Sequence, residues 1–162
     1  MELKRRLDLR AIFIGLYVLA FAVYIIVGLQ PAEAANYAVS AELAIPDIGL
    51  NTDVTTLEFD GHQLNTPREI VGSYSEAQNK TLLIGHSTTV FQNLNQVQLG
   101  DTINYDNKVY RVTAIDMVAK SEVKMSKILA PAEKDTIVIM TCAGQLLNGD
   151  DATHRLMVTA SI

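Results

Sequence analysis

Three side chains of this sequence could together perform nucleophilic catalysis. Cys142 is the single cysteine among 162 residues, and it ends the run Thr136–Cys142, which predicts a buried strand. A thiol with the reference pKa of about 8.5 is mostly protonated at neutral pH, so Cys142 needs a basic partner. His86 follows the apolar run Lys80–Gly85 and is the best-placed general acid–base candidate.

Arg155 is the third candidate, at the start of the last predicted strand. A guanidinium stays charged and cannot act as a base, but it can donate hydrogen bonds to a carbonyl oxygen on which negative charge develops. Of the other histidines, His62 falls in a predicted turn and His154 is a reserve candidate. Each residue also has an ordinary interpretation, because a lone cysteine is more often a packed small side chain than a nucleophile.

The elements that must position these residues are short apolar runs separated by turn residues. Seven runs predict strands: Leu43–Ile48 (interrupted by Pro46), Asp53–Phe59, Lys80–Gly85, Thr102–Tyr105, Lys108–Met117, Thr136–Cys142 and Arg155–Ile162. Asp60-Gly61 indicates a hairpin turn, and Gly144 marks a turn after Cys142. The pattern predicts an all-β barrel or sandwich of seven or eight strands.

The segments between these strands predict loops with little helix. Ile70–Lys80 is rich in Gly, Ser and Asn and is predicted to be a loop. Val90–Val97 is predicted to form one or two helical turns, with Phe91, Leu94 and Val97 on one face. Val118–Asp135 is predicted to be a loop that holds a helical turn.

The N-terminal part predicts a membrane anchor. Ala11–Leu29 contains no charge, and a helix of that length just crosses a bilayer core of roughly 30 Å. Four basic residues precede it, which places the N-terminus in the cytoplasm. We therefore expect a cytoplasmic tail (1–10), a transmembrane helix (11–29), a linker (30–40) and an extracellular domain (41–162). A cleaved signal peptide ending near Ala34 and Ala35 is the alternative.

Charge and cysteine content limit the partners and the fold. The first 30 residues carry a net charge of +2 within a total of −5, so residues 31–162 carry −7. This acidic domain argues against nucleic acid as a partner. With one cysteine no internal disulfide can form. A free thiol outside the cell raises the expectation that this cysteine takes part in a reaction.

The order His86, Cys142, Arg155 and the sequence around these residues resemble the sortase family. The motifs that carry the resemblance are I-P-x-I at Ile45–Ile48, L-L-I-G-H at Leu82–His86, Phe91 and Leu94, L-G-D-T-I at Leu99–Ile103, V-Y-R-V at Val109–Val112, T-C at Thr141–Cys142 and R-L-M-V-T-A at Arg155–Ala160. One position departs: the family usually has Thr-Leu-x-Thr-Cys, and Val138 replaces the first threonine here.

The resemblance implies a membrane-anchored cysteine transpeptidase on a closed, eight-stranded β-barrel. Cys142 would attack the Thr–Gly carbonyl of a Leu-Pro-x-Thr-Gly-type sorting signal and form a thioester, while His86 would act as acid and then base. Arg155 would steady the oxyanion and the substrate backbone. A cell-wall precursor amine, or a lysine of a pilin subunit, would accept the acyl group.

The resemblance also implies a substrate groove. Ile84, Met140 and Thr141 match groove positions of the family, and the Val118–Asp135 loop matches the segment that shapes specificity. No cofactor is expected. Calcium is the alternative, with Glu122 and Asp101 as the kind of acidic ligands that some sortases use.

Reference pKa values predict the pH behaviour of such an enzyme. The productive form pairs a thiolate with an imidazolium, yet the reference pKa of cysteine lies about two units above that of histidine. Only about one molecule in a hundred is then in this form near pH 7.5, so we expect a slow enzyme with a bell-shaped pH profile.

Two other functions remain open from the sequence. One is another exported thiol transpeptidase or peptidase that acts on cell-wall peptides, although such families usually place the cysteine before the histidine. The other is a membrane-tethered β-barrel binding module, without enzymatic activity, whose cysteine is buried.

Overall fold

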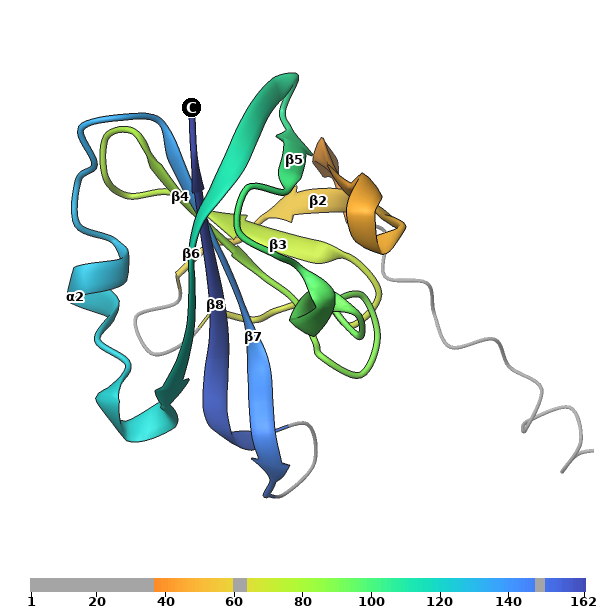
Figure 1. Cartoon of the computed structure of the whole chain (residues 1–162), viewed down its shortest axis with the longest axis vertical. Coiled ribbons are helices and arrows are strands. Elements are labelled where there is room, and N and C mark those ends of the chain that lie inside the picture. Colours follow the sequence, from red (N-terminus) through yellow and green to blue (C-terminus); the bar gives the residue numbers. More distant parts are fainter. Residues whose placement is uncertain (1–36, 60–63, 148–150) are drawn as a thin grey trace, which may run out of the picture. The chain divides into compact units, whose positions relative to one another are not determined.

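The computed structural model describes residues 37–59, 64–147 and 151–162 (Figure 1). The predicted cytoplasmic tail, transmembrane helix and most of the linker lie outside these residues, as do His62 and the Asp60-Gly61 turn. No helix within the described residues has the length and apolar character that crossing a membrane requires. Phe59 and Leu64 form an isolated antiparallel bridge.

Eight strands close into a barrel, as the resemblance implies. Their bounds are β1 (Val39–Ile45), β2 (Leu50–Thr56), β3 (Val71–Tyr74), β4 (Lys80–Ile84), β5 (Thr102–Tyr105), β6 (Lys108–Ala119), β7 (Thr136–Leu146) and β8 (Ala152–Ser161). Around the barrel the order is β1-β2-β3-β4-β7-β8-β6-β5. The pairs β2–β3 and β4–β7 are parallel, and the others are antiparallel.

Within the described ranges, four short helical segments lie between the strands. They are three 3₁₀ turns, η1 (Pro46–Ile48), η2 (Leu94–Gln96) and η3 (Lys120–Glu122), and the single-turn helix α2 (Met125–Ile128). Phe91, Leu94 and Val97 are all buried, which confirms that they share one face. η3 and α2 lie within the predicted Val118–Asp135 loop, although β6 runs into this segment as far as Ala119.

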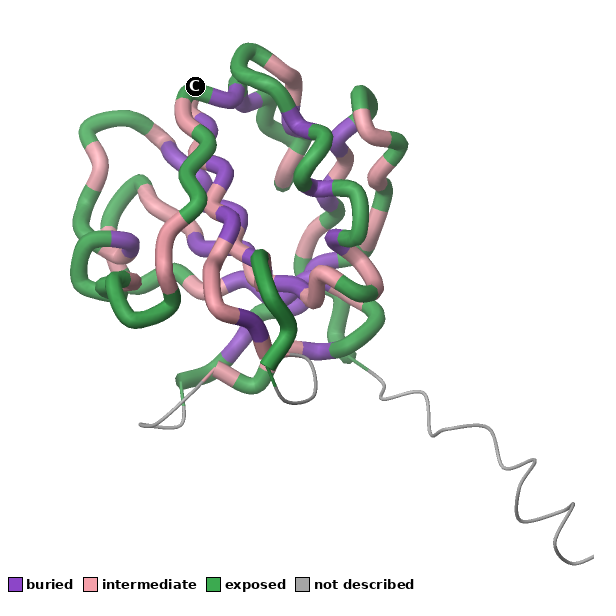
Figure 2. Tube along the Cα trace, turned by 60° about the horizontal axis from the view of Figure 1, so that its bottom comes forward, coloured by how far each residue is buried: buried purple, intermediate pink, exposed green. Residues whose placement is uncertain are grey.

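Alternation along the strands builds two apolar clusters. Buried residues recur at every second position of β8 from Leu156 to Ala160. Figure 2 shows how buried and exposed positions are distributed along the trace. In β7, Ile137 and Ile139 belong to the main cluster inside the barrel, whereas Val138 packs with Leu82 and Ile128 in a second, smaller cluster. Because β7 alternates between them, the second cluster covers the outer face of β4 and β7 beneath α2.

The first strands begin earlier than predicted. β1 starts at Val39, inside the predicted linker, and ends at Ile45 because Pro46 cannot donate to the ladder and opens η1 instead. Gly49 turns the chain in the left-handed region (φ 65°), and β2 begins directly at Leu50. The predicted strand Asp53–Phe59 therefore overlaps β2 but extends too far.

The prediction of a loop over Ile70–Lys80 is wrong at its start. Val71, Gly72 and Ser73 are buried in β3, which lies between β2 and β4. Ser73 Oγ donates to the Thr55 carbonyl (3.2 Å). A Cβ on Gly72 would come within 2.4 Å of Leu57. Tertiary packing thus holds Gly72 and Ser73 in a strand although their intrinsic strand preference is low.

Cys142 does not lie at the end of its strand. β7 continues to Leu146, and the predicted turn at Gly144 is a bulge between Ala143 and Leu146, with Gly144 at φ 80°. β8 likewise starts at Ala152, before Arg155. The β7–β8 hairpin therefore holds both residues within paired strands.

Candidate active site

The β7–β8 hairpin places the thiol opposite the guanidinium. Cys142 and Arg155 are register partners of this antiparallel pair. Directly opposite residues project from the same face with Cβ atoms about 5 Å apart. Arg155 therefore reaches the thiol through strand pairing, although twelve residues lie between them in the chain.

The imidazole comes from the neighbouring strand on the other side of β7. β4 runs parallel to β7, with Ile84 beside Met140, so the residues after Ile84 run alongside Thr141 and Cys142. The Gly85 N–H donates to the Met140 carbonyl (3.4 Å), and Thr141 Oγ1 donates to the Gly85 carbonyl (2.7 Å). These two bonds hold His86 alongside Cys142.

The backbone around His86 is tightly packed. The N–H of Phe91 donates to the His86 carbonyl (3.0 Å), and His86 Nε2 lies 3.4 Å from the Thr66 carbonyl oxygen. A Cβ on Gly85 would come within 2.7 Å of the buried Phe91 ring, so only glycine fits before this histidine.

His86, Cys142 and Arg155 line one pocket of about 170 Å³. The other residues that line it are Thr66, Ile84, Gly85, Met140 and Thr141, so all six candidates from the sequence meet here. The reserve candidate His154 is not among these lining residues. Its Nδ1 lies 2.8 Å from Thr153 Oγ1, and its register partner is Ala143.

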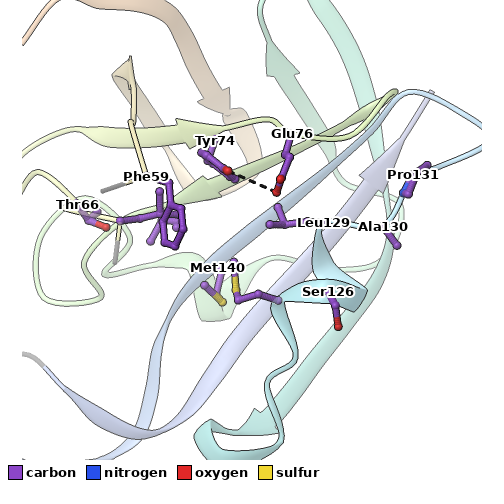
Figure 3. Close-up of a pocket in the computed structure, with 12 residues that line it drawn as sticks. Phe59, Thr66, Tyr74, Glu76, Ser126, Leu129, Ala130, Pro131 and Met140 are labelled. Carbon is purple, nitrogen blue, oxygen red and sulfur yellow. Dashed lines mark hydrogen bonds between the residues drawn. The ribbon is translucent and has the colours of Figure 1, made fainter. Parts of the chain in front are cut away.

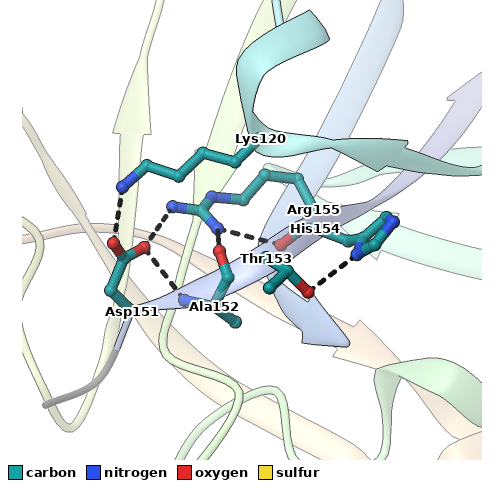
Figure 4. A network of polar contacts seen from close by, with 6 residues as sticks. All are labelled: Lys120, Asp151, Ala152, Thr153, His154 and Arg155. Atoms are coloured by element: carbon teal, nitrogen blue, oxygen red, sulfur yellow. Dashed lines mark hydrogen bonds and ion pairs between the residues drawn. The ribbon is translucent and has the colours of Figure 1, made fainter. Parts of the chain in front are cut away.

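A carboxylate anchors Arg155 (Figure 4). Asp151 Oδ1 lies 2.8 Å from Arg155 Nη2, while Nη1 donates to the carbonyls of Ala152 and His154 (2.9 Å each). Asp151 Oδ2 accepts from the Lys120 ammonium at 2.5 Å. These hydrogen bonds, first that of Lys120 and then that of Arg155, lower the pKa of Asp151 to about 2, so this carboxylate is ionised at neutral pH.

An apolar groove of about 900 Å³ leads away from this pocket (Figure 3). Thr66, Ile84 and Met140 line both, which makes them the junction. The far wall comes from α2 and the residues after it, including Met125, Leu129 and Pro131. The remaining lining residues are Phe59, Leu64, Tyr74, Glu76, Ser126 and Ala130.

The floor of this groove explains the departure at Val138. Ile84, Met140, Leu64 and Leu129 all pack against the second apolar cluster, to which Val138 belongs. Val138 is 5% exposed and is not among the residues that line the groove. An apolar side chain suits this buried position beneath α2.

A second pocket, of about 270 Å³, lies on the other side of the thiol. Thr141 and Cys142 line it together with the pocket that holds His86 and Arg155. None of its other lining residues is charged. They are Ser87, Phe91, Gln92, Asn95, Met117, Ala143, Gly144 and Leu156. Cys142 therefore lies between two openings.

The two acidic residues considered for calcium do not lie together. Asp101 precedes β5 and accepts the Gln98 N–H (2.8 Å), near the Arg111 end of β6. Glu122 follows the opposite end of β6, after Ala119. Within the described ranges, no group of three or more His, Cys, Asp or Glu side chains could hold a metal ion.

Several residues of the site had no signal in the sequence. Lys120 belongs to the predicted Val118–Asp135 loop, and Asp151 lies between the predicted strands Thr136–Cys142 and Arg155–Ile162. Thr66 and Phe59 join the groove from the segment between β2 and β3. Only the fold brings these residues to the ends of β4, β7 and β8.

A closed β-barrel that gathers a thiol, an imidazole and a guanidinium in one pocket is the framework of a cysteine-dependent enzyme. The family model described as the sortase domain matches residues 43–162. The chain therefore belongs to the sortase family of cysteine transpeptidases.

Solved structures of sortases share this fold. A lid mutant of sortase A from Corynebacterium diphtheriae is 26% identical, with 80% of this chain and 72% of that chain covered and a TM-score of 0.60. Sortase C-1 from Actinomyces oris is also 26% identical, with coverage of 76% and 71% and a TM-score of 0.56. Sortase A from Listeria monocytogenes, at 18% identity, 76% and 86% coverage and a TM-score of 0.58, supports the fold alone. A comparison with curated protein sequences found no match.

Proposed function

We propose that this transpeptidase cleaves a Leu-Pro-x-Thr-Gly-type sorting signal between Thr and Gly and transfers the surface protein to an amine. The observation that carries the proposal is that Cys142, His86 and Arg155 line one pocket at the end of an apolar groove. The reaction needs these three functional groups around one carbonyl.

The chemistry assigns one role to each side chain. Cys142 Sγ attacks the threonine carbonyl carbon, and the C–N bond to glycine breaks as the thioester forms. His86 gives its proton to the leaving amine and later takes one from the incoming amine. Arg155 donates hydrogen bonds to the carbonyl oxygen while it carries negative charge.

The apolar groove fits the part of the signal that precedes the cleaved bond. With the threonine carbonyl at Cys142, the preceding residues extend past Ile84 and Met140, which lie at the junction. The leucine and proline side chains then reach the groove floor and the wall formed by Leu129. Burial of such apolar side chains favours binding by about 1.5–3 kcal/mol each.

The amine enters from the opposite side of the thiol. The pocket of about 270 Å³ that includes Gln92 and Asn95 adjoins Cys142 on the side away from the groove. The leaving glycine departs through it, and the acceptor amine takes the same place. The acceptor is an amine of a cell-wall precursor or a lysine of a pilin subunit.

The proposed location of the enzyme is the cell membrane, where its substrates are exported. In this proposal residues 11–29 span the bilayer, residues 1–10 form a cytoplasmic tail, and residues 30–40 link the anchor to an extracellular catalytic domain (41–162). The charge-free length of Ala11–Leu29 and the basic residues before it support this arrangement.

A quenched fluorescent Leu-Pro-x-Thr-Gly peptide tests the proposal. We expect the full chain to cleave it and the Cys142→Ala, His86→Ala and Arg155→Ala variants to lose activity at least about a hundredfold. No cleavage by the wild-type chain, together with a thiol that resists iodoacetamide in the folded state, would favour a binding module instead.

A further inference from the structure

Asp151 lies between the guanidinium of Arg155 and the ammonium of Lys120 (Figure 4). Its carboxylate is itself fixed, because Oδ1 accepts the backbone N–H of Ala152 (2.9 Å) as well as Arg155 Nη2 (2.8 Å). Oδ2 accepts from Lys120 Nζ. Three donors from two elements therefore converge on one acid.

These contacts orient the guanidinium. A guanidinium carries five N–H groups in one rigid plane, so fixing Nη1 and Nη2 fixes the direction of every other donor. Nη1 is held by the carbonyls of Ala152 and His154, and Nη2 by Asp151. The Arg155 side chain is 16% exposed, so its contact with the acid is partly shielded from water.

Lys120 extends the connection to the substrate groove. It is the first residue of η3, in the segment between β6 and β7 that continues into α2 and Leu129. Met125 and Leu129 of this segment line the groove. The Asp151 carboxylate thus binds both Arg155 and Lys120, and Lys120 belongs to the segment that forms the groove wall.

We infer that Asp151 is a positioning residue that holds the Arg155 guanidinium toward the carbonyl oxygen at Cys142, with Lys120 anchoring the acid. The inference rests on the proposed function for its kinetic part only. A partly exposed ion pair at this site contributes only a little to stability, so the loss of Asp151 is expected to lower the urea midpoint slightly and to act mainly on the reaction rate.

Kinetics of the full chain form the first test. Asp151→Ala is expected to lower kcat about tenfold with KM within about twofold, because it misdirects donors that act on the developing charge. Asp151→Glu restores part of the loss, and Lys120→Met gives a smaller loss of about threefold by the same argument. In an Arg155→Ala background, Asp151→Ala has no further effect on kcat.

The matched control is Asp135→Asn. Asp135 forms a comparable ion pair with Lys108 (2.6 Å), but it precedes β7 at the end opposite Cys142. Removing this charge is expected to leave kcat unchanged. An equal loss of kcat in this control would overturn the inference, because the loss of any surface ion pair would then lower kcat.

Nuclear magnetic resonance of the Arg155 Nε–H group gives a readout that needs no substrate. The signal is assigned by its loss in Arg155→Lys, and we expect it to be ordered in the wild-type chain and mobile in Asp151→Ala and Lys120→Met. A signal of unchanged order, or an unchanged kcat in both variants, overturns the inference. If Arg155 becomes mobile but the wild-type chain cleaves no sorting peptide, the positioning role stands and the proposed function fails.

Discussion

At the scale of single residues, the Thr141 hydroxyl joins the two strands that carry the thiol and the imidazole. It is buried and donates to the Gly85 carbonyl at 2.7 Å, directly before His86. Thr141→Val keeps the shape but leaves this carbonyl without that donor, which costs about 1–3 kcal/mol. We expect a lower urea midpoint and, because a small misplacement of His86 costs rate, a kcat/KM reduced about tenfold.

Thr113→Val is the matched control for this change. The Thr113 hydroxyl also donates to a strand carbonyl, that of Thr159 (3.2 Å), but this bond is exposed to water. Its loss is expected to lower the unfolding free energy by less than about 0.5 kcal/mol and to leave kcat/KM unchanged. Equal effects of the two variants would contradict the role given to Thr141.

Asp151 predicts a pH dependence of stability. Its pKa in the folded chain, about 2, lies below the ordinary value of 3.8, so the ionised carboxylate favours the folded state. This contribution is fully present above about pH 4 and is lost as the pH falls through about 2. The urea midpoint of Asp151→Asn should therefore lie below that of the wild-type chain at neutral pH, and the difference should narrow toward pH 2. A difference that is constant with pH would contradict this.

Residue type together with place in the chain selected the three principal candidates. Cys142 is the single cysteine, His86 follows an apolar run and Arg155 starts the last predicted strand. Asp151 could not be selected in this way. It stands in a run of polar loop residues, and nothing in that run distinguishes the acid that meets Arg155 from its neighbours. Its role depends on where the hairpin places it against η3.

At the scale of elements, strongly apolar strands could be predicted and polar ones could not. β4, β7 and β5 match their predicted starts because continuous β-branched and apolar runs define them. β3 was missed because burial between two strands, not composition, makes it a strand. The sequence did not predict that β7 continues past Cys142, because the glycine of a β-bulge looks the same in a sequence as the glycine of a turn.

The wall of the apolar groove gives a prediction at this scale, on the proposal that the groove binds the sorting peptide. Leu129 follows α2 and lines the groove away from the thiol. Leu129→Ser is expected to raise KM for the sorting peptide about fivefold with kcat within about twofold, because it removes apolar contact that does not change during the reaction.

Leu99→Ser is the control for this prediction. Leu99 is 68% exposed, precedes β5 and lines neither the groove nor the pocket at Cys142. It should leave both constants unchanged. A fall in kcat for Leu129→Ser without a change in KM would show that the leucine acts elsewhere than in peptide binding.

At the scale of the whole molecule, the barrel and both apolar clusters lie within residues 37–162. A chain that begins at residue 37 is therefore expected to unfold in one cooperative urea transition, with the midpoint of the full chain, and to cleave the peptide in solution. A gradual transition, or a lower midpoint, would show that the barrel depends on the first 36 residues.

The all-β fold was predictable because seven short apolar runs indicate strands, and the order of motifs that resembles the sortase family selects the closed barrel. The mixed pairing was not. The parallel pair β4–β7 brings together segments that are far apart in the sequence, and β2–β3 pairs two consecutive strands in parallel. No local pattern encodes either pairing. This pairing of β4 with β7 is what brings His86 to the thiol.

The central claim is that Cys142 carries the acyl group, and intact-mass spectrometry of the full chain with a Leu-Pro-x-Thr-Gly peptide tests it most directly. We expect an adduct with the mass of the fragment that ends in threonine, less one water, attached at Cys142, released by hydroxylamine and absent in Cys142→Ala. Cleavage of the peptide by Cys142→Ala at the wild-type rate, or an adduct on any other residue, would contradict the account.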